Sequence, residues 1–163
     1  MISKEVDPMK LRIRQRVLAF TDSYDVYDEF GEARYFVRAE LIALGHQIHV
    51  YDKQTGREVG TIRQRLLTLF PTFEIEINGI TAGTVRRELS FLRPRYDVDF
   101  RGWKAEGNIM GWDYRVTESG QTVMTISKQL VSWSDTYTLE YHSAENEIPG
   151  LLLVIAIDAA NCT

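Results

Sequence analysis

Short runs of alternating apolar and polar residues follow one another along most of the chain. The first, Met9 to Val17, has mostly apolar side chains at its odd positions and cations at the even positions between them. Thr72 to Ile77 repeats the alternation, with Phe73, Ile75 and Ile77 on one face. A side-chain period of two is typical of a β-strand with one buried and one solvated face.

Turn residues separate these runs. Gln54-Thr-Gly and Asn78-Gly79 lie between paired runs, and Asn-Gly adopts the tight turn that suits the twist of a hairpin. The stretch Leu41 to Gly45 is interpreted as a bend or one short helical turn. The twelve strands predicted are Met9–Val17, Ser23–Asp28, Ala33–Ala39, Gln47–Lys53, Arg57–Arg65, Thr72–Ile77, Ile80–Glu88, Arg95–Arg101, Trp103–Asn108, Asp113–Glu118, Thr122–Lys128 and Asp135–His142.

The end of the chain has a different pattern. Leu151 to Ile157 carries no polar side chain, and a helix over about residues 149–160 would be apolar on every face. Such a helix is either buried all round or lies in a membrane. The run is shorter than the roughly twenty residues that span a bilayer, and Asp158 would be costly in lipid. Two alanines after Asp158 favour a core helix over the alternative, a buried strand.

No amphipathic helical segment separates the strands, which favours an antiparallel meander over parallel βαβ units. Open sheets of so many twisted strands tend to close or to split. A barrel wider than about eight strands leaves space inside, and an apolar helix can fill it. We therefore predict a mainly β (α+β) fold, a closed antiparallel β-barrel of about twelve strands around a buried C-terminal hydrophobic helix. The alternative is a β-sandwich with the helix covering one face.

Length and cysteine content indicate the number of domains and the cellular compartment. The 163 residues fit one domain, over 9–163, preceded by a flexible tail at residues 1–8. Cys162 has no intramolecular partner, which suits a reducing compartment. The N-terminal residues contain no apolar segment of the kind found in signal peptides. We expect a cytoplasmic monomer.

The net charge of −4 is unevenly distributed. Residues 1–105 carry a net charge of +2, and residues 106–163 a net charge of −6. Because nucleic-acid binding depends on many Lys and Arg contacts to phosphate, the acidic total argues against a nucleic-acid partner. A local basic patch in the first part of the chain is compatible with these values.

Several segments resemble a known family. They include Ile13-Arg-Gln-Arg-Val, Tyr24-Asp-Val-Tyr-Asp-Glu-Phe-Gly, Ile62-Arg-Gln-Arg-Leu-Leu-Thr-Leu-Phe-Pro, Ser132-Trp-Ser-Asp-Thr-Tyr-Thr-Leu and the closing apolar run with its Ala-Ile-Asp-Ala. In this order, over about residues 9–160, the chain resembles the LURP-one-related proteins, in particular their bacterial YxjI-like group, which share the Tubby C-terminal fold. The last two segments are the most specific.

The resemblance implies a twelve-stranded antiparallel barrel around a buried C-terminal helix. Related branches of this fold include Tubby proteins, which bind phosphoinositides, and phospholipid scramblases, which act at membranes. No phosphoinositide-binding motif matches this chain residue by residue, so the resemblance assigns no site residue here. Fold alone does not determine function.

The sequence contains no arrangement that points to catalysis. His46 and His49 would lie on opposite faces of a strand, which does not suit a shared metal. Cys162 has no feature of a nucleophile, and neither a Gly-x-Ser-x-Gly elbow nor a Gly-rich phosphate loop is present. We predict a protein that is not an enzyme, without catalytic residues, metal or cofactor.

Asp158 lies next to the apolar run and would enter the barrel with it. Because an isolated buried carboxylate is strongly unfavourable, Asp158 must be paired, hydrogen-bonded or neutral. We predict a structural role in which it holds the helix to the barrel wall or rim. A functional acid is the alternative, for which no acid/base partner is visible.

The clearest candidate site is a basic strand face. Its residues, which share one face of the first predicted strand, are Lys10, Arg12, Arg14 and Arg16. Four cations on one face could bind anionic phospholipid head groups. The alternative is an ordinary solvated face with acidic residues on neighbouring strands. Further arginines that could extend the patch are Arg63, Arg65, Arg86, Arg87, Arg93 and Arg95.

The sequence therefore leaves the biochemical function open between two classes. The first is a non-catalytic binding or scaffold module, peripheral at the inner membrane face, whose partner is an anionic phospholipid surface. The second is a soluble structural or protein-interaction module with no lipid role.

Overall fold

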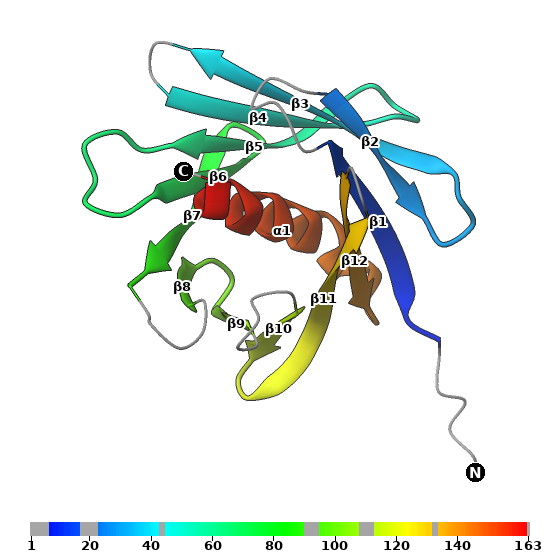
Figure 1. Cartoon of the computed structure of the whole chain (residues 1–163). Coiled ribbons are helices and arrows are strands. Elements are labelled where there is room, and N and C mark those ends of the chain that lie inside the picture. Colours follow the sequence, from blue (N-terminus) through cyan, green and yellow to red (C-terminus); the bar gives the residue numbers. More distant parts are fainter. Residues whose placement is uncertain are drawn as a thin grey trace.

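The strands close into a barrel with a helix inside it (Figure 1). A computed structural model describes residues 7–16, 23–42, 45–89, 95–107, 113–131 and 134–162. Within these residues, twelve strands pair antiparallel with their neighbours in sequence, and β1 pairs with β12 to complete the barrel. The predicted closed barrel around a C-terminal helix is confirmed, and the sandwich alternative is wrong.

The elements follow one another in a simple meander. The first six strands are β1 (Met9–Arg16), β2 (Ser23–Asp28), β3 (Ala33–Ile42), β4 (Gly45–Asp52), β5 (Glu58–Gln64) and β6 (Thr72–Ile77). The others are β7 (Ile80–Glu88), β8 (Arg95–Asp99), β9 (Trp103–Gly107), β10 (Asp113–Glu118), β11 (Gln121–Val131) and β12 (Ser134–Tyr141). A short 3₁₀ helix, η1 (Ala144–Asn146), leads into α1 (Glu147–Cys162).

The boundaries differ from the predicted ones in a few places. Leu41, Ile42 and Gly45, predicted as parts of a bend or helical turn, belong to the β3–β4 ladder, which continues to the pairs of Leu41 with His46 and Ile42 with Gly45. Residues 43–44 between them lie outside the described residues. Arg101 lies in a turn after β8, with a φ of 56°. Of the predicted strands, Val17 and Asn108 lie outside the described residues, as do residues 1–6 of the predicted tail.

The helix is enclosed because its apolar surface fills the barrel. Residues 151–157 are each no more than 3% exposed, so every face of this part of α1 contacts the wall. Inward residues of the strands, such as Leu11, Ile62 and Phe73, belong to the same core. Full burial stabilises an aliphatic side chain by about 1.5–3 kcal/mol, and the helix contributes seven consecutive apolar residues.

The two ends of the barrel differ. Tight turns join strands at the end where α1 begins, called the proximal end here; residues 78–79 and 119–120 are examples. The other end, where α1 finishes, is called the distal end. There β5 ends, the loop of residues 65–71 follows, and β6 begins.

One close contact fixes the position of α1 against the wall. A Cβ placed on Gly60 of β5 would lie 2.6 Å from both terminal carbons of Leu152. The wall therefore needs glycine at this position because the leucine of the helix occupies the space.

This contact predicts that a larger side chain at position 60 and a smaller one at position 152 partly compensate each other in stability. Gly60→Ala should lower the free energy of unfolding by about 1–3 kcal/mol through overpacking. Leu152→Ala should lower it by about 2–5 kcal/mol through the cavity it leaves. The double variant should lose less than the sum of these values, because the added methyl group fills part of the cavity. Denaturant unfolding of the four proteins measures this coupling, and additive losses would contradict the position of α1.

Candidate functional site

A carboxylate anchors the start of α1 to the barrel. Glu147 accepts hydrogen bonds from the hydroxyls of Tyr35 on β3, at 2.5 Å, and Tyr141 on β12, at 2.7 Å. The guanidinium of Arg34 lies 3.1 Å from the same carboxylate. Glu147 is also in the first turn of α1, where negative charge is favoured by the helix dipole. Two strands from opposite parts of the chain thus hold the N-terminus of the helix.

A second group of polar side chains holds the end of α1. Asp158 is buried and accepts a hydrogen bond from the Tyr137 hydroxyl. Asn161 accepts a hydrogen bond from Tyr96, at 2.6 Å, and donates one to Tyr114, at 3.3 Å. The tyrosines come from β8, β10 and β12, so this group ties the helix to the wall at the distal end.

Burial changes the ionisation of these tyrosines. Burial raises the pKa of Tyr96 above the ordinary tyrosine value, and its hydrogen bond with Tyr114 acts in the same direction. Burial likewise raises the pKa of Tyr24, and the negative charge of Asp158 raises it further. For Tyr35 and Tyr141, burial and then the hydrogen bond to Glu147 raise the pKa. All four hydroxyls remain neutral at physiological pH.

The sequence pattern pointed to Asp158 but missed Glu147 and the tyrosines. Glu147 immediately precedes the apolar run, and an acidic residue at the start of a helix is a usable signal. Tyr35 and Tyr141 lie on the apolar sides of their strands, where a tyrosine hydroxyl needs a buried partner. The register of the barrel strands determines which carboxylate accepts a hydrogen bond from each tyrosine hydroxyl.

The candidate basic face lies on the outer surface of β1. Leu11 and Ile13 point into the core, so positions 10, 12, 14 and 16 share the outer face. Lys10 lies 3.4 Å from Glu140 of β12 and is partly neutralised by it. Arg12 is exposed between Thr138 of β12 and Tyr27 of β2. The charge of Arg12 therefore has uncharged neighbours in register.

On the β12 side, the residues in register with positions 14 and 16 are uncharged as well. Arg14 pairs with Thr136 and Arg16 with Ser134. On the other side, the outward Asp25 of β2 is bound by Lys53, whose Nζ lies 3.1 Å from it. The face called the β1 basic face thus consists of positions 12, 14 and 16 of β1 beside a row of hydroxyl residues on β12.

The other arginines do not extend the β1 basic face. They lie on or beside β5, β7 and β8, across the barrel from β1, and Arg93 is outside the described residues. Most of those that are described have acidic partners: Arg63 with Glu76, Arg65 with Glu74, Arg86 with Asp97, and Arg95 with Glu106. The positive net charge of residues 1–105 therefore comes from arginines that lie far apart in the fold, not from one patch.

A bulge opens the wall between β8 and β9. The backbone N–H of Trp103 donates to the carbonyl of Phe100 across the turn, at 3.0 Å, whereas the strand ladder resumes only at Tyr96 and Ala105. Three residues of β8 therefore stand opposite a single residue of β9. Such bulges interrupt the ladder and bend the bulged strand.

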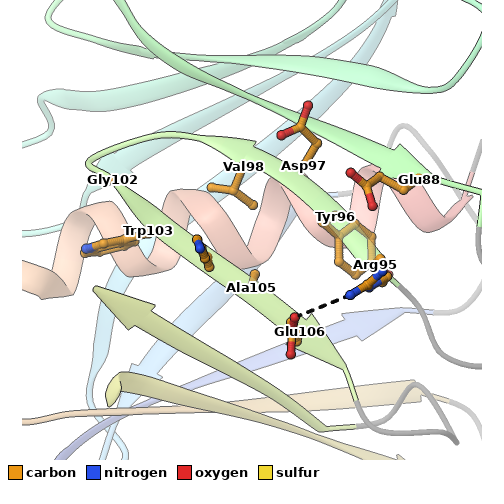
Figure 2. Close-up of a pocket in the computed structure, with 10 residues that line it drawn as sticks. Glu88, Arg95, Tyr96, Asp97, Val98, Gly102, Trp103, Ala105 and Glu106 are labelled. Atoms are coloured by element: carbon orange, nitrogen blue, oxygen red, sulfur yellow. Dashed lines mark ion pairs between the residues drawn. The ribbon is translucent and has the colours of Figure 1, made fainter. Parts of the chain in front are cut away.

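An open groove of about 500 Å³ lies over this bulge (Figure 2). Its polar lining is formed by Glu88, Arg95, Asp97, Lys104 and Glu106. In Figure 2, Arg95 and Glu106 face each other across β8 and β9, with their ion pair at 3.9 Å. The lining contains no serine, cysteine, histidine or threonine. It offers charged contacts of both signs but no Ser–His or Cys–His pair for nucleophilic catalysis.

The histidines do not assemble a metal site. The ring Nδ1 of His49 lies 3.1 Å from Glu58, and its Nε2 lies 3.9 Å from Glu40, on the outer surface of the barrel. His46, three residues earlier on β4, falls on the opposite face of the strand. No group of three or more His, Cys, Asp or Glu residues suited to a metal ion occurs in the described part of the chain.

The contact of Asp158 predicts a coupled effect on stability. Asp158→Ala should lower the free energy of unfolding by about 1–3 kcal/mol, because it leaves the Tyr137 hydroxyl without this acceptor. A thermal melt should register about 2–4 °C for each kcal/mol. Asp158→Leu combined with Tyr137→Phe, which makes both partners apolar, should be closer to wild type. If Asp158→Ala has the same melting temperature as the wild type, the contact between Asp158 and Tyr137 has no structural role.

The tyrosines predict a loss of stability in alkali. Their pKa values are higher in the folded state than the ordinary value of about 10, so the folded state binds more protons above that pH. Stability should be level up to about pH 10 and fall as pH rises further. Tyr96→Phe should reduce the slope of this fall, measured by denaturant unfolding at a series of pH values. An unchanged slope would mean that Tyr96 ionises alike in both states.

The comparisons with known proteins agree with this architecture. Residues 9–158 match the family model described as LURP-one-related. An uncharacterized Bacillus subtilis (strain 168) protein, YxjI, is 25% identical over 150 residues, which cover 92% of each chain. An Arabidopsis thaliana protein solved by X-ray diffraction superposes with a TM-score of 0.61 over 93% of this chain and 91% of its own, at 16% identity.

These relationships fix the family and the fold but name no activity. The plant structure, at its low identity, supports the barrel architecture alone. In the described residues, no helix is both long and apolar enough to cross a bilayer. From the match over nearly its whole length, the chain belongs to the LURP-one-related family.

Proposed function

We propose that this protein is a non-catalytic binding module that associates with anionic phospholipid head groups through the β1 basic face. The observation that carries the proposal is the register of β1 with β12. It places Thr138 beside Arg12 and pairs positions 14 and 16 of the β1 backbone with Thr136 and Ser134, so the β12 residues in register with these three positions are uncharged. A cation whose neighbours in register are uncharged, as Arg12 is, is available to a charged surface.

The remaining surface supports a non-catalytic module. The interior is filled by α1, so a ligand must bind outside the wall or at an end of the barrel. The lining of the β8–β9 groove contains no serine, cysteine or histidine, and the family match names no reaction. A peripheral position at the inner face of the membrane would follow from lipid binding in a cytoplasmic protein.

The alternative is a soluble structural or protein-interaction module with no lipid role. The ion pairs on the outer wall favour it, because most of the described arginines away from β1 have an acidic partner. Isolated surface pairs contribute little stability, but they reduce the positive potential available to a membrane. The two functions differ in whether the β1 basic face binds vesicles.

Co-sedimentation with vesicles tests the proposal. Wild-type protein should bind vesicles that contain phosphatidylserine and bind less as salt rises, because salt screens exposed charges. Arg12→Glu combined with Arg14→Glu should weaken binding by about tenfold or more, since each cation contributes about 1 kcal/mol near an anionic surface.

The matched control reverses two arginines at the proximal turns, Arg57→Glu with Arg101→Glu. It changes the net charge equally but leaves the β1 basic face intact, so it should bind nearly as the wild type does. Absence of wild-type binding at low salt would exclude lipid association. Equal weakening by both double variants would mean that net charge, not this face, governs binding.

A further inference from the structure

Exposed apolar side chains gather at the distal end of the barrel. They belong to the end of β3, to the loop between β5 and β6, and to the residue after β7. The set, called the leucine rim, comprises Leu41, Ile42, Leu66, Leu67, Leu69 and Leu89. Leu67 and Leu69 are the most exposed, at 105% and 90% of the reference area. Large apolar side chains exposed together mark an interaction surface.

Contacts place the three segments next to one another at the distal end. A Cβ on Gly45 would lie 3.1 Å from a terminal carbon of Leu66, and Gly45 pairs with Ile42 at the end of the β3–β4 ladder. The loop is therefore packed against the end of that hairpin. On its other side, the N–H of Arg87 donates to the carbonyl of Pro71, at 3.1 Å, which brings β7 beside the loop.

One residue of the loop has a strained backbone. Leu67 has a φ of 61°, in the left-handed region that leucine seldom adopts. Strained conformations of this kind persist where the surrounding structure imposes them, and they are concentrated at functional sites. The side chain that bears this strain is fully exposed, so core packing does not account for it.

Arginines lie at the base of the leucine rim, two of them beside acidic partners: Arg63 lies 3.5 Å from Glu76, and Arg65 pairs with Glu74. Residues 59–73 include Arg63 and Arg65 and no acidic residue. Arg65 contacts Glu74 at 2.6 Å but keeps about half of its side chain exposed, at 49%. Arg87 is exposed beside the same loop. Apolar tips with arginines at their base match the interfacial region of an anionic bilayer, where apolar groups enter below the head groups and cations remain among them.

From these observations, we propose that the leucine rim inserts into the interfacial region of an anionic phospholipid bilayer. The inference rests on the proposed function, because it takes the same membrane as the partner. Since β1 runs towards the distal end, the β1 basic face and the leucine rim can act in sequence. The arginines attract the anionic surface, and the leucines then enter it.

A bilayer fits the leucine rim better than a second copy of the chain. A symmetric dimer brings the same patch of both subunits together, so Arg65 and Arg87 would approach their own copies. The two most exposed leucines also protrude from a loop instead of lining a groove. A fluid bilayer accepts protruding apolar tips without a complementary surface.

The first test is co-sedimentation of Leu67→Ser with Leu69→Ser on vesicles of phosphatidylcholine and phosphatidylserine. This variant should bind at least about tenfold more weakly than wild type, because two fully exposed leucines lose their burial in lipid. The salt dependence of binding should remain, since the arginines are unchanged. The matched control is Phe30→Ser with Ile80→Ser, which removes two exposed apolar side chains at the proximal end and should bind as wild type does.

The second test reports on insertion directly. Thr68→Cys in a Cys162→Ser background takes an environment-sensitive fluorophore within the loop. Its emission should shift to the blue with vesicles that contain phosphatidylserine. Analytical ultracentrifugation of the unlabelled wild type and the leucine variant, without lipid, tests the dimer.

The outcomes separate this inference from the proposed function. Suppose that wild type and the leucine variant bind vesicles equally well and that the emission of the label does not shift. Insertion of the leucine rim is then wrong, whereas binding by the β1 basic face stands. If no protein binds and the label does not shift, both proposals are wrong. A concentration-dependent dimer that the leucine substitutions dissociate would also overturn insertion. Weakened binding with a blue shift supports it.

Discussion

The structure depends on the filling of the barrel by an apolar helix. Twelve strands enclose more space than their own side chains fill, and an empty apolar interior would be strongly unfavourable. Residues 151–157 supply the missing volume, with apolar side chains on every face. The close approach of Leu152 to Gly60 indicates how tightly helix and wall fit. The wall and the helix are therefore parts of one core.

Filling the interior determines where the protein can act. Polar groups inside serve to hold the helix, with Glu147 at its start and Asp158 and Asn161 towards its end. A ligand or partner can therefore bind only on the outer wall or at the ends of the barrel. The β1 basic face and the leucine rim lie on these surfaces, one supplying charge and the other apolar area. Neither contributes to the core, so both can be altered without removing the helix from its place.

Much of the fold was predictable from local pattern, whereas the surfaces depend on register. Alternation and turn residues located the strands, and the all-apolar run located the helix inside the barrel. The partners of Asp158 and Glu147 could not be predicted, because tyrosines distant in sequence reach them only when the barrel closes. The same holds for the arginines, since only the pairing of β1 with β12 places hydroxyl residues beside Arg12. Leu67 was missed because its exposure follows from a loop conformation, which side-chain periodicity does not encode.

Removal of the helix tests the central claim most directly. A chain of residues 1–146 keeps every strand and η1 but lacks α1. If the helix is part of the core, this chain should show no cooperative thermal or denaturant transition, and its backbone amides should exchange rapidly with solvent. The full chain under the same conditions should unfold in one transition with slowly exchanging strands. Cooperative unfolding of the shortened chain, with protected strands, would contradict the account.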